Sequence, residues 1–401
     1  MADFNPFDPR LRTNPYEVYR ELREESPVFW SQMMQVWILT RYDDVLEVLK
    51  DYVHFSSERF RANNPLVQAL ESQRLASGPL GTTPTMLSTD PPPHTRMRGL
   101  VNKAFTPRQV ERIRPQMQEI AEGLLDALPE PGRIDVVKDF AIPFPIIVIS
   151  AMLGVPASDR DQFKAWSTDI AGSLGGPFLP PEAIDRSVKA SNEIADYFRV
   201  QIAQRRAEPR DDLMSALCAA EEQGDLLTED ELIATCILLL IAGNETTTNL
   251  IGSGMYTLLQ NPDERRRLQA EPSLLPSGVE EMLRYEPAAQ MTSRIANEGA
   301  EIDGIRFEPG QVILPVMAAA NRDPAHFADP DRFDVARQPN RHLSFGQGIH
   351  YCLGAPLAVA ETRIAFQTLL RRMPEPTAAF EAPDWNQSFI LRGLKTLPVS
   401  Y

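Results

Sequence analysis

An unusually long helical pattern constrains the fold of this chain more than any other feature of its sequence. The pattern begins at Thr228, which forms a capping box with Glu231, and it continues to about Leu259, where Asn261-Pro262 stops it. These limits enclose about 30 residues, or about 45 Å of helix at 1.5 Å per residue. Because residues 236–242 are apolar, the helix should cross the interior of the molecule.

The rest of the chain is also mainly helical in pattern. Its 35 prolines are spread along the sequence and divide it into many elements. A cap made by Ser277 and Glu280 is expected to begin a helix that ends at Glu286. Further helices are expected at 43–49, 94–105, 107–128, 143–153 and 353–372. Short strands at 36–40, within 302–313 and within 389–399 should form a minor sheet.

Two stretches, 60–90 and 172–181, are rich in turn-forming residues and are predicted to be connectors. The first is long, with room for one helix, and long ordered loops are often functional. Both connectors are candidate lids over a binding site. The sequence shows no βαβ alternation and no break in composition. We therefore expect a single domain over residues 1–401 that is mainly α with a minor β region.

Composition and charge exclude several classes of protein. The 401 residues are 43% hydrophobic and 24% charged, as in ordinary soluble domains. A net charge of -15 argues against nucleic-acid binding, which needs basic patches. No secretory signal is expected from the N-terminus, and no apolar run approaches the roughly 20 residues that span a bilayer. The odd set Cys218, Cys236 and Cys352 lacks disulfide or zinc spacing, which favours a reducing cytoplasm.

One cysteine lies in a glycine-rich loop, Phe345-Gly-Gln-Gly-Ile-His-Tyr-Cys-Leu-Gly354, which runs into a predicted helix. Exposed N–H groups at a helix N-terminus stabilise a thiolate. A thiolate bound to haem iron pushes electron density onto the metal and favours O–O cleavage. The glycines allow the backbone to approach sulfur and porphyrin closely. A lone cysteine after such a turn would more often be a buried structural residue.

This loop resembles the signature of the cytochrome P-450 family, Phe-Gly-x-Gly-x-His-x-Cys-x-Gly, at every fixed position. Three further matches in family order extend the resemblance over nearly the whole chain. The resemblance implies a cytochrome P-450-type domain with its long central helix over a buried haem b. It also implies that Cys352 is the axial ligand of the iron, and that Phe345, Gly346, His350 and Gly354 border the cofactor.

A second match interrupts the long apolar helix. Ala242-Gly243-Asn244-Glu245-Thr246 resembles the oxygen-binding motif Ala-Gly-x-Glu/Asp-Thr of the family. Ala242 and Gly243 are small enough to let a flat cofactor approach, and Thr246 is placed to bond back to the Ala242 carbonyl. Cleavage of O₂ consumes protons, so Glu245 and Thr246 are the expected relay. A polar patch facing solvent is the alternative interpretation.

A third match is the pair Glu281 and Arg284, which share one helix face. Surface ion pairs at this spacing are common and contribute little to stability. In the family the matching pair joins a later arginine to lock the core under the haem. Arg332, in Pro330-Asp-Arg-Phe333, matches that third position.

The fourth match concerns the haem propionates. His94 and Arg98 fall at i and i+4 of a predicted helix, where arginine makes charge-assisted bonds to carboxylates. Arg294 and His350 match two more positions that the family uses for propionates. Each of these residues, taken singly, is more often a surface cation.

The substrate pocket follows from matching the family segment by segment. A mostly apolar lining implies a hydrophobic or amphipathic small molecule. The sequence does not distinguish steroid, terpene, fatty acid, macrolide or aromatic substrates, and each residue has plain core packing as its alternative role. The candidates are Met86, Leu87, Leu238, Ile241, Ala242, Ala289, Gln290, Ile390 and Leu391.

Together these features predict a haem-thiolate monooxygenase that activates O₂ and hydroxylates or epoxidises a hydrophobic small molecule. The resemblance implies an external ferredoxin or flavodoxin, reduced by its reductase at the expense of NAD(P)H, and a cytoplasmic, monomeric enzyme. A peroxide-driven enzyme and a non-catalytic haem-binding sensor are the alternatives. A basic dock for an acidic partner is expected on the cysteine side. Its residues are Arg96, Lys103, Arg108, Arg112, Arg114, Arg337 and Arg341.

Overall fold

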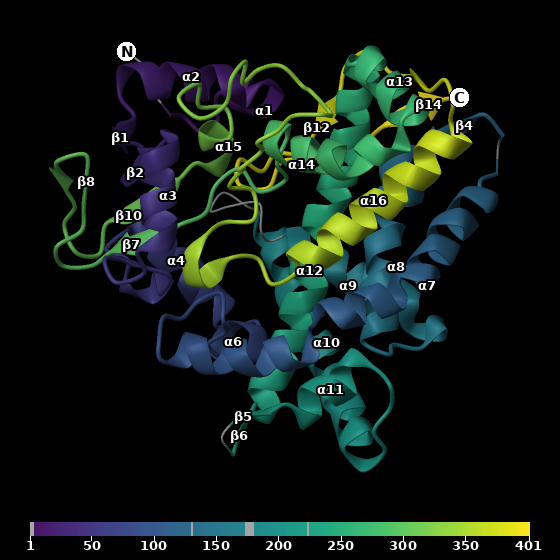
Figure 1. Cartoon of the computed structure of the whole chain (residues 1–401). Coiled ribbons are helices and arrows are strands. Elements are labelled where there is room, and N and C mark those ends of the chain that lie inside the picture. The colour runs from purple at the N-terminus through teal and green to yellow at the C-terminus, as the bar shows by residue number, and fades with distance from the viewer. Residues whose placement is uncertain (1–3, 130, 173–179, 223) are drawn as a thin grey trace.

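The predicted long helix is α12, Glu229–Gln260, which runs through the centre of the molecule (Figure 1). The computed structural model describes residues 4–129, 131–172, 180–222 and 224–401. The predicted capping box is confirmed, because Thr228 Oγ1 accepts from the Glu231 N–H at 3.3 Å and a Glu231 oxygen accepts from the Thr228 N–H at 2.8 Å. Most side chains of α12 are buried, so the helix is the axis around which the core is built.

Prolines start many of the helices that surround α12. A proline in the first turn loses no hydrogen bond and has a backbone angle that suits a helix. The helices that contact α12 are η2 (a π-helix, Val136–Ala141), α8 (Pro143–Met152), α9 (Arg160–Gly172), α10 (Pro181–Ala207), α11 (Leu213–Ala219), α13 (Pro262–Ala270), α14 (Leu275–Tyr285), α16 (Ala355–Arg372) and the short α5 (Pro79–Thr82). The remaining helices are α1 (Pro9–Thr13), α2 (Pro15–Glu25), α3 (Tyr42–Lys50), α4 (Pro65–Arg74), α6 (Pro93–Ala104), α7 (Pro107–Asp126) and α15 (Met317–Ala320), with short 3-10 turns η1 (Arg59–Arg61), η3 (Ala157–Asp159), η5 (Pro272–Leu274) and η6 (Gly348–His350).

The main sheet lies beside the N-terminal helices, away from the C-terminal end of α16 (Figure 1). Its strand order is β1 (Val28–Ser31), β2 (Val36–Leu39), β10 (Val312–Pro315), β7 (Arg294–Ala296) and β3 (Phe55–Ser56). Only β2 and β10 are parallel within it. The sheet therefore joins the first sixty residues to the segment that precedes the cysteine loop.

The other strands form small sheets and hairpins. A three-stranded sheet contains β11 (Thr377–Ala378), β14 (Pro398–Ser400) and β4 (Arg133–Asp135). The hairpins are β5 (Glu221–Glu222) with β6 (Asp225–Leu226), β8 (Glu301–Ile302) with β9 (Ile305–Arg306), and β12 (Asp384–Trp385) with β13 (Leu394–Thr396). The prediction of a mainly helical chain with a minor sheet is confirmed.

Several local predictions were wrong. The stretch 60–90 holds α4 and α5, where one helix was expected, and Asn64 caps α4 by accepting from the N–H groups of Leu66 and Val67. Ser277 does not cap α14, which starts at Leu275, because its hydroxyl donates to the carbonyls of Leu274 and Val335. Of the predicted connector at 172–181, residues 173–179 lie outside the described part of the chain. Among the helices that the structure describes, none combines the length and apolar character needed to cross a bilayer.

Candidate active site

The cysteine loop is a closed turn in front of α16. The Cys352 N–H donates to the Phe345 carbonyl at 2.9 Å, and the Gly346 N–H donates to the Leu343 carbonyl at 2.8 Å. Gly348 has a φ of +71°, and a Cβ there would lie 2.6 Å from the Leu49 carbonyl oxygen. Only glycine fits this position, so the loop geometry depends on the motif residue itself.

The Cys352 sulfur lies beside groups that favour its anionic form. Helix α16 begins at Ala355, two residues later than predicted, with Gly354 as its N-cap. Burial raises the pKa of the Cys352 thiol, while bonds from the backbone N–H groups of Gly354 and Ala355 and the charge of Arg98 lower it. The side chain is therefore suited to be a thiolate ligand once a cation balances its charge.

The motif in α12 adjoins open space. Ala242 is exposed although Ile241 before it and Asn244 after it are buried. A Cβ added to Gly243 would meet no atom within 4 Å. Thr246 Oγ1 donates to the Ala242 carbonyl at 2.8 Å, which confirms the predicted back-bond. This face of the central helix is therefore free to receive a flat group.

Glu245 is held by a residue that the sequence interpretation missed. Asn249 Nδ2 donates to Glu245 Oε1 at 3.3 Å, and Asn249 is only 3% exposed. Burial raises the pKa of Glu245, and the Asn249 bond partly opposes the rise. A Cβ on Gly393, in the β12–β13 loop, would lie 1.9 Å from Asn249 Oδ1, so the loop backbone contacts the amide directly. The i,i+4 spacing from Glu245 is the signal that would have identified Asn249.

Three of the four predicted propionate-binding residues lie at the cysteine loop, and the fourth, Arg294, begins β7. The rings of His94 and His350 are 4.5 Å apart, and Arg98 donates to the Tyr351 carbonyl at 2.7 Å. His94 is 3% exposed, and neither of its ring nitrogens has a partner in the structure. Burial, with the charges of His350 and Arg98, lowers the pKa of His94 to about 4, so this ring is neutral near pH 7.

Arg294 is buried and has no carboxylate partner among the residues that the structure describes. It is 7% exposed, and it donates to the Ser293 carbonyl at 2.9 Å and to Thr292 Oγ1 at 3.5 Å. Burial and the nearby charge of Arg59 lower the pKa of Arg294 to about 10, so it remains a cation at neutral pH. Buried polar groups normally find partners. A cofactor with two carboxylates would supply them to His94 and Arg294, and the residues present thus fit a haem.

Asp90 organises the same region. Its carboxylate accepts from the Ser56 hydroxyl and, at 3.1 Å, from the Ser57 N–H, and it lies 3.8 Å from His350 Nε2. Burial opposes ionisation of Asp90, but the nearby His350 ring and the bonds from Ser56 and Ser57 outweigh it and lower its pKa. Asp90 therefore adds a negative charge beside the predicted propionate site.

The predicted ion-pair lock exists, with a different third member. Glu281 and Arg284 are fully buried and bonded at 2.7 Å through both carboxylate oxygens. The assignment of Arg332 was wrong, because 63% of its side chain is exposed and only its carbonyl contacts Arg284. Arg337 fills the position, with its Nε 3.0 Å from Glu281 Oε1. The chain folds so that the later of the two arginines turns inward.

The comparisons with known proteins agree with this geometry. The model of the cytochrome P450 family matches residues 5–374. This chain belongs to the cytochrome P450 family. PksS of Bacillus subtilis, a polyketide biosynthesis cytochrome P450, is 40% identical over 99% of this chain and 98% of PksS. Its solved structure has a TM-score of 0.90 at 38% identity and covers 99% of both chains.

Two further P450s are similar over nearly their whole lengths. The 6-deoxyerythronolide B hydroxylase of Saccharopolyspora erythraea is 39% identical over 96% of this chain and 95% of its own. The structure of CYP109E1 from Bacillus megaterium, in complex with testosterone, has a TM-score of 0.86 at 38% identity and covers 96% of this chain and 99% of that one. Members of the family are monooxygenases that contain haem b.

The predicted substrate-pocket residues of this P450 are only partly brought together. Ala289 forms an isolated β-bridge with Leu391, and the Gln290 N–H donates to the Ile390 carbonyl at 2.9 Å. The assignment of the Gln290 side chain to the substrate pocket was wrong, because this residue is 1% exposed. Its amide donates to the Pro287 carbonyl and accepts from the Tyr19 hydroxyl. Of the others, Met86 and Ile241 are buried, Leu238 is half-buried and Leu87 is 51% exposed.

The predicted basic dock is largely neutralised within the chain. Arg96 pairs with Asp225 and Glu231, Arg112 with Asp211, and Arg114 with Glu111. The assignment of Arg337 to this surface was wrong, since it belongs to the Glu281 lock. In the parts of the chain that are described, Arg108 and Arg341 are exposed and have no acidic partner.

A buried carboxyl lies near the oxygen-binding motif. Glu361, on α16, is 1% exposed, and burial raises its pKa well above the usual range. The sequence interpretation did not single it out, because a glutamate in a helix pattern reads as a surface residue. It is a carboxyl inside the P450 core whose burial favours the neutral form.

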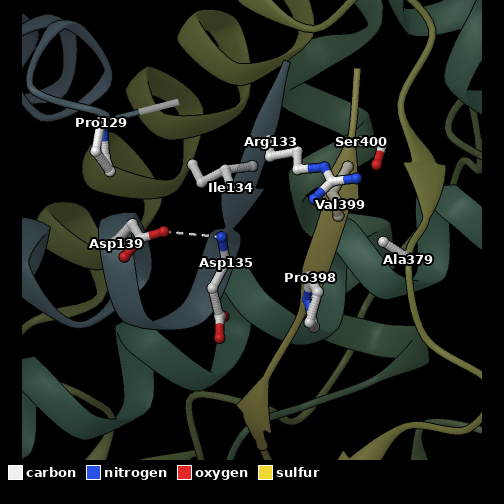
Figure 2. Close-up of a pocket in the computed structure, with 9 residues that line it drawn as sticks. All are labelled: Pro129, Arg133, Ile134, Asp135, Asp139, Ala379, Pro398, Val399 and Ser400. Carbon is white, nitrogen blue, oxygen red and sulfur yellow. Dashed lines mark hydrogen bonds between the residues drawn. The ribbon is translucent and has the colours of Figure 1, made fainter. Parts of the chain in front are cut away.

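A separate pocket is lined in part by β4 and β14 (Figure 2). Its volume is about 430 Å³, and Figure 2 shows Asp139 accepting from the Asp135 N–H at 2.8 Å within it. The pocket borders strands that follow the C-terminal end of α16. Helix α16 begins just after the cysteine loop, and its 18 residues are about 27 Å long. None of the predicted site residues lines it. The lining residues are Pro129, Arg133, Ile134, Asp135, Asp139, Ala379, Pro398, Val399 and Ser400.

Proposed function

We propose that this P450 hydroxylates or epoxidises a hydrophobic small molecule with O₂, with Cys352 as the ligand of the haem iron. The geometry of the cysteine loop carries this proposal. It places one sulfur beside the N–H groups that begin α16 and beside the Arg98 charge. The haem, when bound, supplies O₂ binding and O–O cleavage.

The residues of α12 contribute protons and space. Glu245 holds a proton more readily than an exposed carboxyl, because burial raises its pKa. Its Oε1 accepts from Asn249, which leaves Oε2 to carry the proton. Thr246 Oγ1 donates to the Ala242 carbonyl and has lone pairs free to accept a proton from the Glu245 side. Ala242 and Gly243 leave the adjoining face open.

For the substrate we propose a bulky, mainly apolar molecule. The predicted pocket positions are apolar apart from the discarded Gln290. Two similar P450s bear on size, because one is a 6-deoxyerythronolide B hydroxylase and another was solved with testosterone. A ligand screen with a macrolactone, a steroid and a long-chain fatty acid, read by the shift of the Soret band, tests the class.

For electron supply we propose a ferredoxin or flavodoxin with its NAD(P)H-dependent reductase. Arg108 and Arg341 support this proposal, because both are exposed cations from the predicted basic dock. We also propose that the enzyme is a monomer in the cytoplasm. Its three cysteines are free, as expected in a reducing compartment.

The decisive experiment is the optical spectrum of the reduced, CO-bound protein. The parent should show the red-shifted Soret band of a thiolate complex, and Cys352→Ser should lose it. Cys218→Ser, which changes a half-buried cysteine elsewhere, should keep the band. A parent without the band would overturn the proposal. Turnover with peroxide but with no electron donor would favour the peroxide-driven alternative, and a normal spectrum without any turnover would favour the sensor.

A further inference from the structure

Arg59 lies at the end of β3, beside Arg294. Strand β3 pairs with β7 so that Ser56 faces Ile295, and Arg59 begins η1 three residues after Ser56. Helix η1 contacts β7, the strand that begins with Arg294. The two guanidinium groups are close enough for the charge of Arg59 to lower the pKa of Arg294.

The side chain of Arg59 has no acceptor among the described residues. Glu58 is the acid next to Arg59 in sequence, and Glu71 is the acid whose charge acts on Arg59. Both already form ion pairs with other arginines. Glu58 pairs with Arg61 at 2.6 Å, and Glu71 pairs with Arg74 at 3.2 Å. Arg59 is half-buried. Burial removes water from its guanidinium, which has five hydrogen-bond donors, and a nearby anion would offset that cost.

The same strand end is tied to the predicted propionate site. The hydroxyl of Ser56 and the N–H of Ser57 hold Asp90, which in turn lies 3.8 Å from His350 Nε2. Arg59 is two residues beyond Ser57, in the 3-10 turn that follows this strand end. The turn also contacts β7, whose first residue, Arg294, is one of the residues that the haem propionates are expected to meet.

Charge balance gives an independent reason for a third arginine. Two propionates and Asp90 would bring three negative charges to this side of the haem. Arg98 and Arg294 supply two permanent positive charges, and the charge of a histidine depends on pH. Arg59 supplies the third positive charge.

We propose that Arg59 binds a haem propionate together with Arg294 and so helps to retain the cofactor. This inference rests on the proposed haem-thiolate function. It adds Arg59 to His94, Arg98, Arg294 and His350 as a residue that contacts the cofactor. The competing occupant is the carboxylate of a substrate, which the experiment distinguishes.

The test compares haem loss from the holoenzymes of Arg59→Gln, Arg59→Lys and Arg61→Gln. Arg61 is the matched control, because it lies in the same 3-10 turn and pairs with Glu58. Transfer of haem to excess apomyoglobin gives the rate. Loss of one charge-assisted bond should speed transfer from Arg59→Gln about tenfold or more. Arg59→Lys should fall between, and Arg61→Gln should match the parent.

Reconstitution with haem dimethyl ester tests whether the effect of Arg59→Gln depends on the propionate charge. The ester has no propionate charge, so Arg59→Gln and the parent should then lose the cofactor at similar rates. An equal acceleration with both haems would contradict the proposal, since the substitution would then act through the fold. Equal rates for Arg59→Gln and Arg61→Gln with ordinary haem would contradict it as well.

Substrate binding separates the competing occupant. Should Arg59→Gln weaken binding of a fatty acid but not of the matching fatty alcohol, with unchanged haem loss, the residue serves the substrate and the inference is wrong. The CO spectrum of each holoenzyme is recorded first. A normal thiolate band in all of them keeps the proposed function intact whatever the haem-loss rates show.

Discussion

Asn249 lies one helical turn beyond Glu245 and donates to its carboxylate at 3.3 Å. The bond holds the carboxylate of the predicted relay in position, and water is largely excluded from Asn249. We expect Asn249→Ala to lower the fraction of electrons that end in product about tenfold, the effect of a hydrogen bond of about 1.4 kcal/mol. Product formed per NAD(P)H consumed is the measurement. Asn261→Ala, which removes an amide bonded to a backbone carbonyl at the end of α12, should leave that ratio unchanged.

Removing the relay residues should separate O₂-driven from peroxide-driven turnover. Glu245→Gln or Thr246→Ala is expected to slow O₂-driven product formation about 10²- to 10⁴-fold, the usual range for a lost proton-transfer group. Turnover with hydrogen peroxide, which brings its own protons, should fall much less. Thr257→Ala is the control, because Thr257 makes the same back-bond in α12, to the Ser253 carbonyl at 2.8 Å. Equal losses with both oxidants would contradict the relay.

The corrected ion-pair lock gives a test of stability. Arg337→Ala leaves the buried Glu281 carboxylate with one partner fewer, and breaking a buried pair costs about 3–5 kcal/mol. Arg332→Ala removes an exposed side chain and should change stability by about 0.5 kcal/mol or less. Midpoints of denaturant unfolding of the two holoenzymes are the measurement. A similar effect of both substitutions would show that the inward-facing arginine is misassigned.

Glu361 should make stability depend on pH. Its pKa is raised in the folded chain by burial, so the folded state holds a proton that the unfolded state releases above its ordinary pKa of about 4.3. The parent should therefore lose stability as pH rises from that value toward the raised pKa, with a slope of about 1.4 kcal/mol per pH unit. Glu361→Gln lacks this loss, so its advantage in unfolding midpoint should grow as pH rises from about 4.3 toward the raised pKa. A constant difference would contradict the prediction.

Arg108 and Arg341, which have no acidic partner in the described part of the chain, should govern docking of the electron donor. Charge reversal in Arg108→Glu or Arg341→Glu is expected to slow reduction by an acidic ferredoxin, mostly at low salt, where steering is strongest. Arg114→Glu, at a position already paired with Glu111 at 2.8 Å, is the comparison. Stopped-flow reduction rates at two salt concentrations measure the effect. Equal responses of all three variants would place the dock elsewhere.

Local chemistry made much of this molecule predictable. The limits of α12 followed from Thr228 and Asn261, which act on their own helix. The cysteine loop was predictable because Gly348 must adopt a positive φ at a close approach. The back-bond of Thr246 was predictable because it lies within one turn.

The errors arose where packing between distant segments determines which partner a side chain contacts. Arg332 and Arg337 lie in the same irregular segment, and only the tertiary path of that segment selects the one that reaches Glu281. Gln290 follows a buried helix and turns toward Tyr19, a partner 271 residues away. Arg59 was missed for the same reason, since its relation to Arg294 arises from the pairing of β3 with β7.

The contact between Gly393 and Asn249 sets a limit for protein engineering. Loops such as the one between β12 and β13 are natural targets when the range of accepted compounds is to be widened, and residue 393 is the last residue of that loop. Any side chain there would displace the Asn249 amide, which lies 1.9 Å from the position of the added Cβ. Libraries that vary this loop should therefore keep residue 393 as glycine, or they will trade catalytic efficiency for diversity without any change in the pocket itself.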